Sequence, residues 1–122
     1  MEMPKPSAAV IARKAQLVER LRGVLPATAV ISDEAETRAY ECDALTAYKC
    51  PPLAAVLPSS TEEVAAVLKI CHDMGVPVVP RGSGTSLAGG ALPTADSVIL
   101  GVARMNDVIE TDYDNRIIRV QT

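Results

Sequence analysis

The spacing of apolar residues predicts a helix at the start of the chain. Over residues 7–22, an apolar stripe of helical period is formed by Ile11, Ala15, Val18 and Leu21. Ser7 can serve as the N-cap of this helix, and Gly23 can end it. The segment TAVIS (28–32) is expected to be a short extended piece.

The next segments are more polar. A second helix is expected to begin near Ser32 or Asp33. Residues 40–52 (YECDALTAYKCPP) have no clear period and end in two prolines, so we expect an ordered loop there.

A strand–helix–strand unit follows this loop. LAAVL (53–57) is typical of a short buried strand, and VPVVP (76–80) is typical of a second one. Between them, Ser60-x-x-Glu63 is a capping-box pattern, and Gly75 follows the helix. One face of this helix carries Val64, Val67, Leu68 and Cys71. The spacing predicts parallel strands joined by a right-handed crossover.

The remaining residues predict further strands. SVILGVA (97–103) is typical of a buried strand, and residues 108–122 are expected to form two strands joined by a turn at 112–116. Ile118 and Val120 alternate toward a core in the last strand, so we expect the chain to be one piece of a longer protein. The predicted fold class is α/β (α+β), with N-terminal helices followed by a βαβ unit and a small mixed sheet.

Composition narrows the classes of protein. With 122 residues, 48% hydrophobic and 22% charged, the chain suits a single globular domain. Three Tyr without Phe or Trp offer no aromatic platform for single-stranded nucleic acid, and the net charge of −3 disfavours polyanions. No nucleic-acid partner is therefore expected. No apolar run is long enough to span a bilayer, and the N-terminus lacks a secretory pattern.

The cysteines and the other titratable residues have plain structural explanations. An odd number of cysteines without C-x-x-C spacing indicates reduced thiols in a cytosolic protein, and no metal site is predicted; these are Cys42, Cys50 and Cys71. His72 lies near a helix end and Glu62 and Glu63 at a helix start, where the helix dipole favours their charges. Asp112 and Asp114 fit a hairpin turn, although such a pair can also hold a metal or perform acid–base chemistry.

The most distinctive stretch is VPVVPRGSGTSLAGGALP (76–93). It holds four of the chain's seven glycines, and Arg81 is the only charged residue between Asp73 and Asp96. Glycine-rich backbone after a strand can turn several N–H groups toward an anion, and arginine is a planar, charged donor. Further hydroxyl donors are Ser83, Thr85 and Ser86. This chemistry suits a phosphate or pyrophosphate.

Neither familiar phosphate motif fits the stretch. A P-loop requires Lys where this chain has Gly90. A dinucleotide fingerprint requires a third glycine where Leu87 stands. A flexible surface loop is the remaining alternative, but the lone arginine and the apolar flanks argue against it.

PVVPRGSGTSLAGGALP resembles the pyrophosphate-binding loop of the vanillyl-alcohol oxidase superfamily, which has a PCMH-type FAD-binding domain. YECDALTAYKCPPLAAVLPSSTEEVAAVLKICH and ARMNDVIETDYDNRIIRVQ are similar to the FAD-binding subunit of bacterial glycolate oxidase, an FAD-linked oxidase, and more loosely to D-lactate dehydrogenases. The resemblance implies a helical arm and loop over residues 1–50. It also implies that residues 51–122 are the first FAD-binding subdomain, incomplete at the C-terminus.

By this resemblance, FAD is the cofactor of a flavoprotein. The family wraps the pyrophosphate with the backbone amides of an Arg-Gly-x-Gly-Thr-Ser segment and places the flavin ring near the residues that follow. The implied cofactor-binding residues are Arg81, Gly82, Ser83, Gly84, Thr85, Ser86, Leu87, Gly89 and Gly90. Members with covalent flavin have His at the position of Thr85, so non-covalent FAD is expected here. Asp43 is expected to make either a structural hydrogen bond or a contact at the flavin edge.

The family transfers a hydride equivalent from the α-carbon of a 2-hydroxy acid to flavin N5. Its substrate pocket belongs to a later cap domain, so we expect no catalytic residue in this chain and no activity from it alone. Electrons would leave through other oxidase subunits or a membrane-linked acceptor, which implies a cytoplasmic protein and leaves attachment at the inner membrane open. The alternative is a non-catalytic nucleotide-binding or assembly module that pairs through its exposed C-terminal strand.

Overall fold

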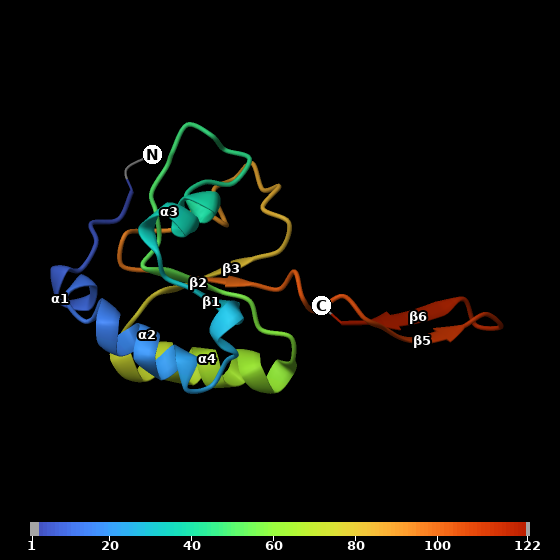
Figure 1. Cartoon of the computed structure of the whole chain (residues 1–122). Coiled ribbons are helices and arrows are strands. Elements are labelled where there is room, and N and C mark those ends of the chain that lie inside the picture. The colour runs from blue at the N-terminus through green and yellow to red at the C-terminus, as the bar shows by residue number, and fades with distance from the viewer. Residues whose placement is uncertain (1–2, 122) are drawn as a thin grey trace.

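The structure is a computed structural model that describes residues 3–121, in which helices cover a four-stranded sheet and a two-stranded hairpin stands apart from them (Figure 1). The helices are α1 (Ala8–Ile11), α2 (Lys14–Arg22), α3 (Glu34–Thr37) and α4 (Thr61–Met74), with 3₁₀ turns at Ala27–Ala29 and Arg38–Tyr40. The strands are β1 (Val30–Ile31), β2 (Ala54–Val56), β3 (Val78–Arg81), β4 (Val98–Gly101), β5 (Val108–Asp112) and β6 (Ile117–Val120).

The larger sheet has the strand order β1–β2–β4–β3. β2 and β3 both run parallel to β4, and Ala55 and Val79 both lie opposite Ile99. β1, from the N-terminal segment, pairs antiparallel with β2 at the edge. The strands of the predicted strand–helix–strand unit are therefore parallel, but β4 lies between them. The mixed helix and sheet content confirms the predicted α+β class.

The main core lies between the sheet and the helices α2 and α4, which lie side by side below it in Figure 1. β4 is buried along its whole length, because a central parallel strand is covered on both faces. Leu17 and Leu21 of α2 and Val67 and Cys71 of α4 are also fully buried. Each aliphatic side chain of this kind contributes about 1.5–3 kcal/mol through burial. The core is aliphatic, as the shortage of aromatic residues requires.

The helix predicted over residues 7–22 is broken in two. α1 and α2 are separated by a turn, so the phase of the apolar stripe shifts between them. Val10 and Leu17 are buried, whereas Ile11 is 39% exposed and Ala15 is also exposed. The prediction that Ile11 and Ala15 belong to the buried stripe was therefore wrong.

The predicted ends of these helices agree with the structure in part. Ser7 occupies the N-cap position of α1, but its side chain makes no capping hydrogen bond. Gly23 ends α2 as predicted. Asp33 caps α3, because its Oδ1 accepts hydrogen bonds from Ala35 N–H (2.8 Å) and Glu36 N–H (3.3 Å).

Helix α4 begins and ends at the predicted residues. Ser60 Oγ accepts a hydrogen bond from Glu63 N–H (3.2 Å), and Glu63 Oε2 accepts one from Ser59 N–H (2.7 Å). Gly75 ends the helix with φ +65°, a conformation that glycine adopts without strain. Leu68 is 46% exposed, contrary to prediction. The buried face of the helix consists of Val67, Ile70, Cys71 and Met74.

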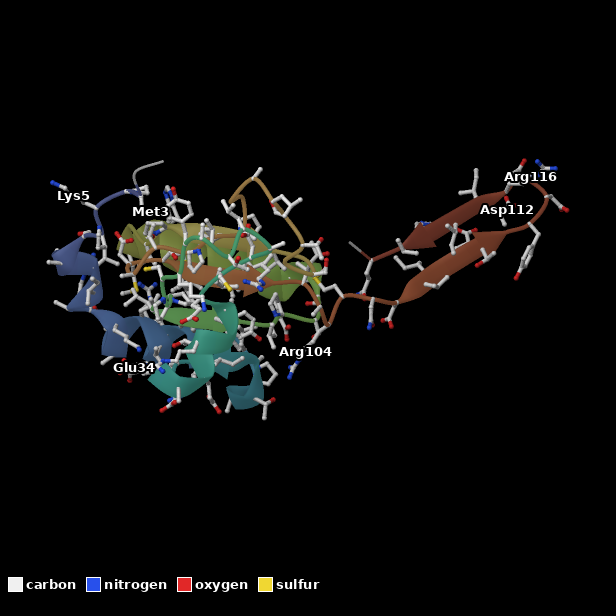
Figure 2. The ribbon with its side chains drawn as sticks, turned by 90° about the horizontal axis from the view of Figure 1, so that it is seen from above. Met3, Lys5, Glu34, Arg104, Asp112 and Arg116 are labelled. Atoms are coloured by element: carbon white, nitrogen blue, oxygen red, sulfur yellow. The ribbon has the colours of Figure 1, made fainter. Side chains whose placement is uncertain are left out.

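The β5–β6 hairpin projects from the body, with Asp112 and Arg116 at its far tip (Figure 2). The predicted turn is confirmed: Asp112 accepts hydrogen bonds from the backbone N–H (3.0 Å) and side chain (2.7 Å) of Asn115. These bonds hold the pKa of Asp112 below its usual value. Ile118 and Val120 are exposed, so within residues 3–121 they do not face a core as predicted.

Candidate functional site

The glycine loop (residues 82–90) begins where β3 ends and lies on the side of the sheet opposite α2 and α4 (Figure 1). Its sharp course uses positive φ angles at Gly84 (+74°) and Gly89 (+77°), which a residue with a side chain adopts only with strain. A Cβ built on Gly82 would have no neighbour within 4 Å, so the absent side chain leaves open space in front of this backbone.

The loop surrounds a hollow of about 400 Å³. It is lined by Pro80, Gly82, Ser83, Gly84, Thr85, Ser86, Gly90 and Ala91. None of these residues carries a charged side chain. Within residues 3–121, no amide of residues 82–87 donates a hydrogen bond to another protein group. Free N–H groups together with hydroxyls form a surface that can bind an anionic oxygen.

The hydroxyl groups of the loop are held by one another and by its backbone. The hydroxyls of Ser83 and Thr85 lie 3.3 Å apart, within hydrogen-bond distance. Ser86 Oγ accepts a hydrogen bond from Ala88 N–H (3.3 Å). Leu87, at the tip, is 75% exposed. The structure thus gathers most of the predicted cofactor-binding residues around the hollow, whereas Arg81, Leu87 and Gly89 lie outside its lining.

Arg81, the last residue of β3, immediately precedes the glycine loop. Its Nη1 donates to the carbonyl oxygens of Cys42 (2.7 Å) and Tyr40 (3.4 Å), and its guanidinium lies 5.7 Å from the centroid of the Tyr40 ring. A Cβ on Gly84 would come within 2.5 Å of Arg81 Nη2. The guanidinium therefore occupies the space between the glycine loop and the residue 40–50 segment.

The 40–50 loop (residues 40–50) is closed by a hydrogen bond from Cys50 N–H to Glu41 O (2.8 Å). Within it, Asp43 is only 5% exposed, and its Oδ1 accepts a hydrogen bond from Leu45 N–H (2.8 Å). The predicted structural hydrogen bond of Asp43 is therefore present. Its Oδ2 is buried and has no partner among the described residues.

Sequence reasoning did not identify Asp96, nor Pro80 and Ala91 in the lining of the hollow. Asp96 is 7% exposed and accepts hydrogen bonds from Ser7 N–H and the Thr94 hydroxyl, both at 2.7 Å. Burial raises the pKa of Asp96, but the hydrogen bonds from Ser7 and Thr94 outweigh it, and the pKa lies below its usual value. An acid at the end of a long uncharged stretch was the available signal. Pro80 and Ala91, which also line the hollow, carried no signal beyond their position in the motif.

The remaining candidates lie away from the hollow lining. His72 is exposed in the last turn of α4, consistent with a structural role. Cys71 is buried, and desolvation raises the pKa of its thiol to about 11. In residues 3–121, no group of three or more His, Cys, Asp and Glu residues is arranged to hold a metal ion. The same residues include no helix long and apolar enough to cross a membrane.

The fold and the glycine loop define the class of this chain. Residues 52–122 match the sequence profile of the FAD binding domain, and the chain belongs to this family. The recognised family and its cofactor, FAD, are thereby confirmed. P-cresol methylhydroxylase, solved with substrate bound, shares the fold with a TM-score of 0.72 and 24% identity, over 88% of this chain and 21% of that protein.

Two relatives are similar to this chain in sequence. The glycolate oxidase subunit GlcD of Escherichia coli (strain K12) is 44% identical over 101 residues, which are 83% of this chain and 20% of the relative. A D-lactate dehydrogenase of Anaerostipes hadrus is 32% identical over 108 residues, 88% of this chain and 22% of the relative. The chain spans about a fifth of the length of these relatives.

The residues of the hollow fit the pyrophosphate of FAD. A pyrophosphate presents several anionic oxygens, and the lining offers N–H and hydroxyl donors without a carboxylate to repel them. The open space in front of Gly82 allows a ligand to approach the backbone closely, which a side chain there would prevent.

Proposed function

We propose that the hollow of the glycine loop binds the FAD pyrophosphate in a flavin-dependent 2-hydroxy-acid oxidoreductase of the glycolate oxidase or D-lactate dehydrogenase type. The observation that carries the proposal is the cluster of unpaired amides from Gly82 to Leu87 around an uncharged hollow. The sequence identity of this chain with a glycolate oxidase subunit and with a D-lactate dehydrogenase supports the choice of 2-hydroxy acids as the substrate class.

Different residues of the glycine loop bind different parts of FAD. The amides of the residues from Gly82 to Ser86 and the hydroxyls of Ser83 and Thr85 donate to the pyrophosphate. The residues from Leu87 to Gly90 would run close to the flavin ring, where the small residues would let the backbone approach it. The FAD is non-covalent, because Thr85 offers no imidazole for attachment.

A bound FAD would supply, at N5, the acceptor for a hydride equivalent from the α-carbon of the 2-hydroxy acid, whose hydroxyl group would lose its proton as the 2-oxo acid forms. The described residues position and desolvate the cofactor, and the groups that bind substrate belong to other parts of the protein. Other oxidase subunits or a membrane-linked acceptor would take up the electrons. This arrangement suits a cytoplasmic protein, which partner subunits can hold at the inner membrane.

A visible absorption spectrum tests cofactor binding after the purified chain is mixed with FAD and the excess removed. The same spectrum is recorded for a longer protein that carries this chain. Gly82→Val should abolish the retained flavin band, because Gly82 lines the hollow and a side chain there would extend into the open space in front of this backbone. Ala15→Val is the control: it adds two carbons at an exposed position of α2 that lies outside the lining of the hollow. Flavin retained by Gly82→Val in the longer protein would place the pyrophosphate elsewhere.

The substrate class is tested separately in the longer flavoprotein. Under anaerobic conditions, glycolate or D-lactate should bleach the oxidised flavin absorption, and the corresponding acids without the 2-hydroxyl group should not. A flavin that neither 2-hydroxy acid reduces would contradict the assigned substrate class while leaving FAD binding intact.

A second candidate function is assembly through the β5–β6 hairpin. The hairpin exposes apolar side chains on both strands, which favours pairing with another protein segment; they are Val108, Ile109, Ile117, Ile118 and Val120. Under this alternative, Ile118→Lys would abolish assembly and Gly82→Val would leave it unchanged. Size-exclusion chromatography with light scattering measures both outcomes.

A further inference from the structure

Arg81 joins two loops that are distant in the sequence. Its backbone ends β3 and leads directly into the glycine loop, while its side chain reaches the carbonyl oxygens of Cys42 and Tyr40. The hydrogen bond to Cys42 spans 39 residues of sequence at 2.7 Å. A hydrogen bond from a charged donor is stronger than one from a neutral donor, and Arg81 is only partly exposed to competing water.

Gly84 is shaped around the same guanidinium. A Cβ at this position would lie 2.5–2.8 Å from three guanidinium atoms of Arg81. The flat guanidinium thus fits closely against the backbone of Gly84 on one side, and the Tyr40 ring lies 5.7 Å away. Lysine could replace the charge of Arg81, but not this planar shape or its fixed set of donors.

The 40–50 loop presents the two carbonyls in a fixed position. Asp43 Oδ1 accepts from Leu45 N–H, which turns the backbone immediately after Cys42. The hydrogen bond from Cys50 N–H to Glu41 O closes the loop. Asp43 therefore acts on the glycine loop indirectly. Its side chain fixes the turn that positions the Cys42 carbonyl, and this carbonyl accepts the hydrogen bond from Arg81.

We propose that Arg81 is a positioning residue, which locks the glycine loop to the 40–50 loop and so orders the amides that face the hollow. Asp43 is the second member of this lock. The inference rests on the proposed function for its consequence in FAD binding, but the lock itself is a property of the chain alone. In this arrangement Arg81 acts on the cofactor through the shape of the loop rather than as a charge contacting phosphate.

The test is amide hydrogen exchange measured by NMR on the chain without cofactor. Arg81→Lys keeps the charge and should accelerate exchange at Leu45 N–H and Cys50 N–H about tenfold, the loss expected for one charge-assisted hydrogen bond. Val76 N–H, bonded to Cys71 O (2.8 Å) at the end of α4, serves as the reference for global unfolding. Arg104→Lys is the matched control, because Arg104 also donates to a backbone carbonyl, that of Thr28 (3.4 Å).

Asp43 variants test the lock from its other side. Asp43→Ala should accelerate exchange at Leu92 N–H, which is bonded to Gly89 O in the glycine loop (3.2 Å). Asp43→Asn retains an acceptor for Leu45 N–H and should restore the original rate. Exchange at Leu45 and Cys50 unchanged by Arg81→Lys, or exchange at Leu92 unchanged by Asp43→Ala, overturns the proposal. A variant that speeds exchange at Val76 equally also overturns it, because the effect is then global.

FAD titration distinguishes this lock from the proposed function. In the longer protein, Arg81→Lys should weaken FAD binding about tenfold, by the same lost hydrogen bond, with no change in its dependence on salt. If Arg81 instead contacted phosphate directly, Arg81→Lys would keep this contact and the affinity for FAD would be unchanged. An unchanged affinity would overturn the positioning role. If the variants change amide exchange as expected but the original longer protein binds no FAD, the lock is supported and the proposed function is rejected.

Discussion

Ser7 and Asp96 are joined by a 2.7 Å hydrogen bond from the Ser7 backbone N–H to Asp96 Oδ2, across 89 residues of sequence. The other carboxylate oxygen of Asp96 accepts from the Thr94 hydroxyl at 2.7 Å. The buried carboxylate thereby fastens the N-terminal arm to the segment that leads from the glycine loop back into β4. One acidic side chain therefore connects two segments that are far apart in the sequence.

This contact makes stability depend on pH. The pKa of Asp96 is lowered in the folded state, so its contribution is fully present above the unfolded value of about 4 and is lost as pH falls through the folded value. Asp96→Asn should cost about 1.5–3 kcal/mol at pH 7, the range for hydrogen bonds to a charged group. Urea unfolding measures this difference, which should shrink below a pH of about 4.

Asp114→Asn is the control for this measurement, because Asp114 lies exposed in the hairpin turn. Its free energy of unfolding should stay close to that of the original chain throughout the titration. A difference between the original chain and Asp96→Asn that is constant from neutral to acidic pH would contradict the role given to the Asp96 charge.

Two glycines of the same loop should respond differently to alanine. Gly84→Ala forces a side chain into a positive φ and against the Arg81 guanidinium, so we expect a loss of about 1–2 kcal/mol in the free energy of unfolding from backbone strain alone. Gly82→Ala meets open space and should change it by less than about 0.5 kcal/mol. Thermal or urea unfolding compares the two, and equal losses would show that the loop does not hold this conformation.

Local chemistry explains which parts of the fold were predictable. The cap at Ser60, the end at Gly75 and the turn at Asp112 depend on residues a few positions apart, so the sequence indicates them directly. The position of the glycine loop follows from its composition and its resemblance to a known motif. Chemistry confined to a short segment can be recognised without knowledge of the fold.

The rest depends on contacts between distant segments. The insertion of β4 between β2 and β3 follows from strand pairing across the whole chain, which periodicity does not encode. The break between α1 and α2 shifted the buried face away from Ile11. Arg81 was recognised as the one charge of its stretch, but its carbonyl partners lie some forty residues upstream. Tertiary structure alone reveals them.

The three thiols should differ in reactivity. Cys71 is fully buried with its pKa raised to about 11, so roughly one thiol in a thousand would be ionised at pH 8 even if reagent could reach it. Cys42 and Cys50 are partly exposed. The pKa of the Cys50 thiol is raised, mainly by partial burial and to a smaller extent by the nearby Asp96 charge. Iodoacetamide should therefore modify Cys42 and Cys50 in the folded chain. Cys71 should react only after unfolding.

Mass spectrometry of the labelled peptides reads out this order. Labelling in denaturant provides the control in which all three thiols are accessible. Modification of Cys71 at the rate of Cys42 in the folded chain would mean that α4 does not pack against the sheet as described.

The flavin should be released when the protein is denatured. Thr85 lines the hollow, and its hydroxyl lies 3.3 Å from that of Ser83; the chain's one histidine, His72, is exposed in the last turn of α4. No imidazole of this chain is therefore placed to form a bond to the ring. After acid precipitation of the FAD-loaded longer protein, all flavin absorption should remain in the supernatant. Fluorescent flavin that stays with the protein band on a denaturing gel would contradict non-covalent binding, and peptide mapping would then identify the attached residue.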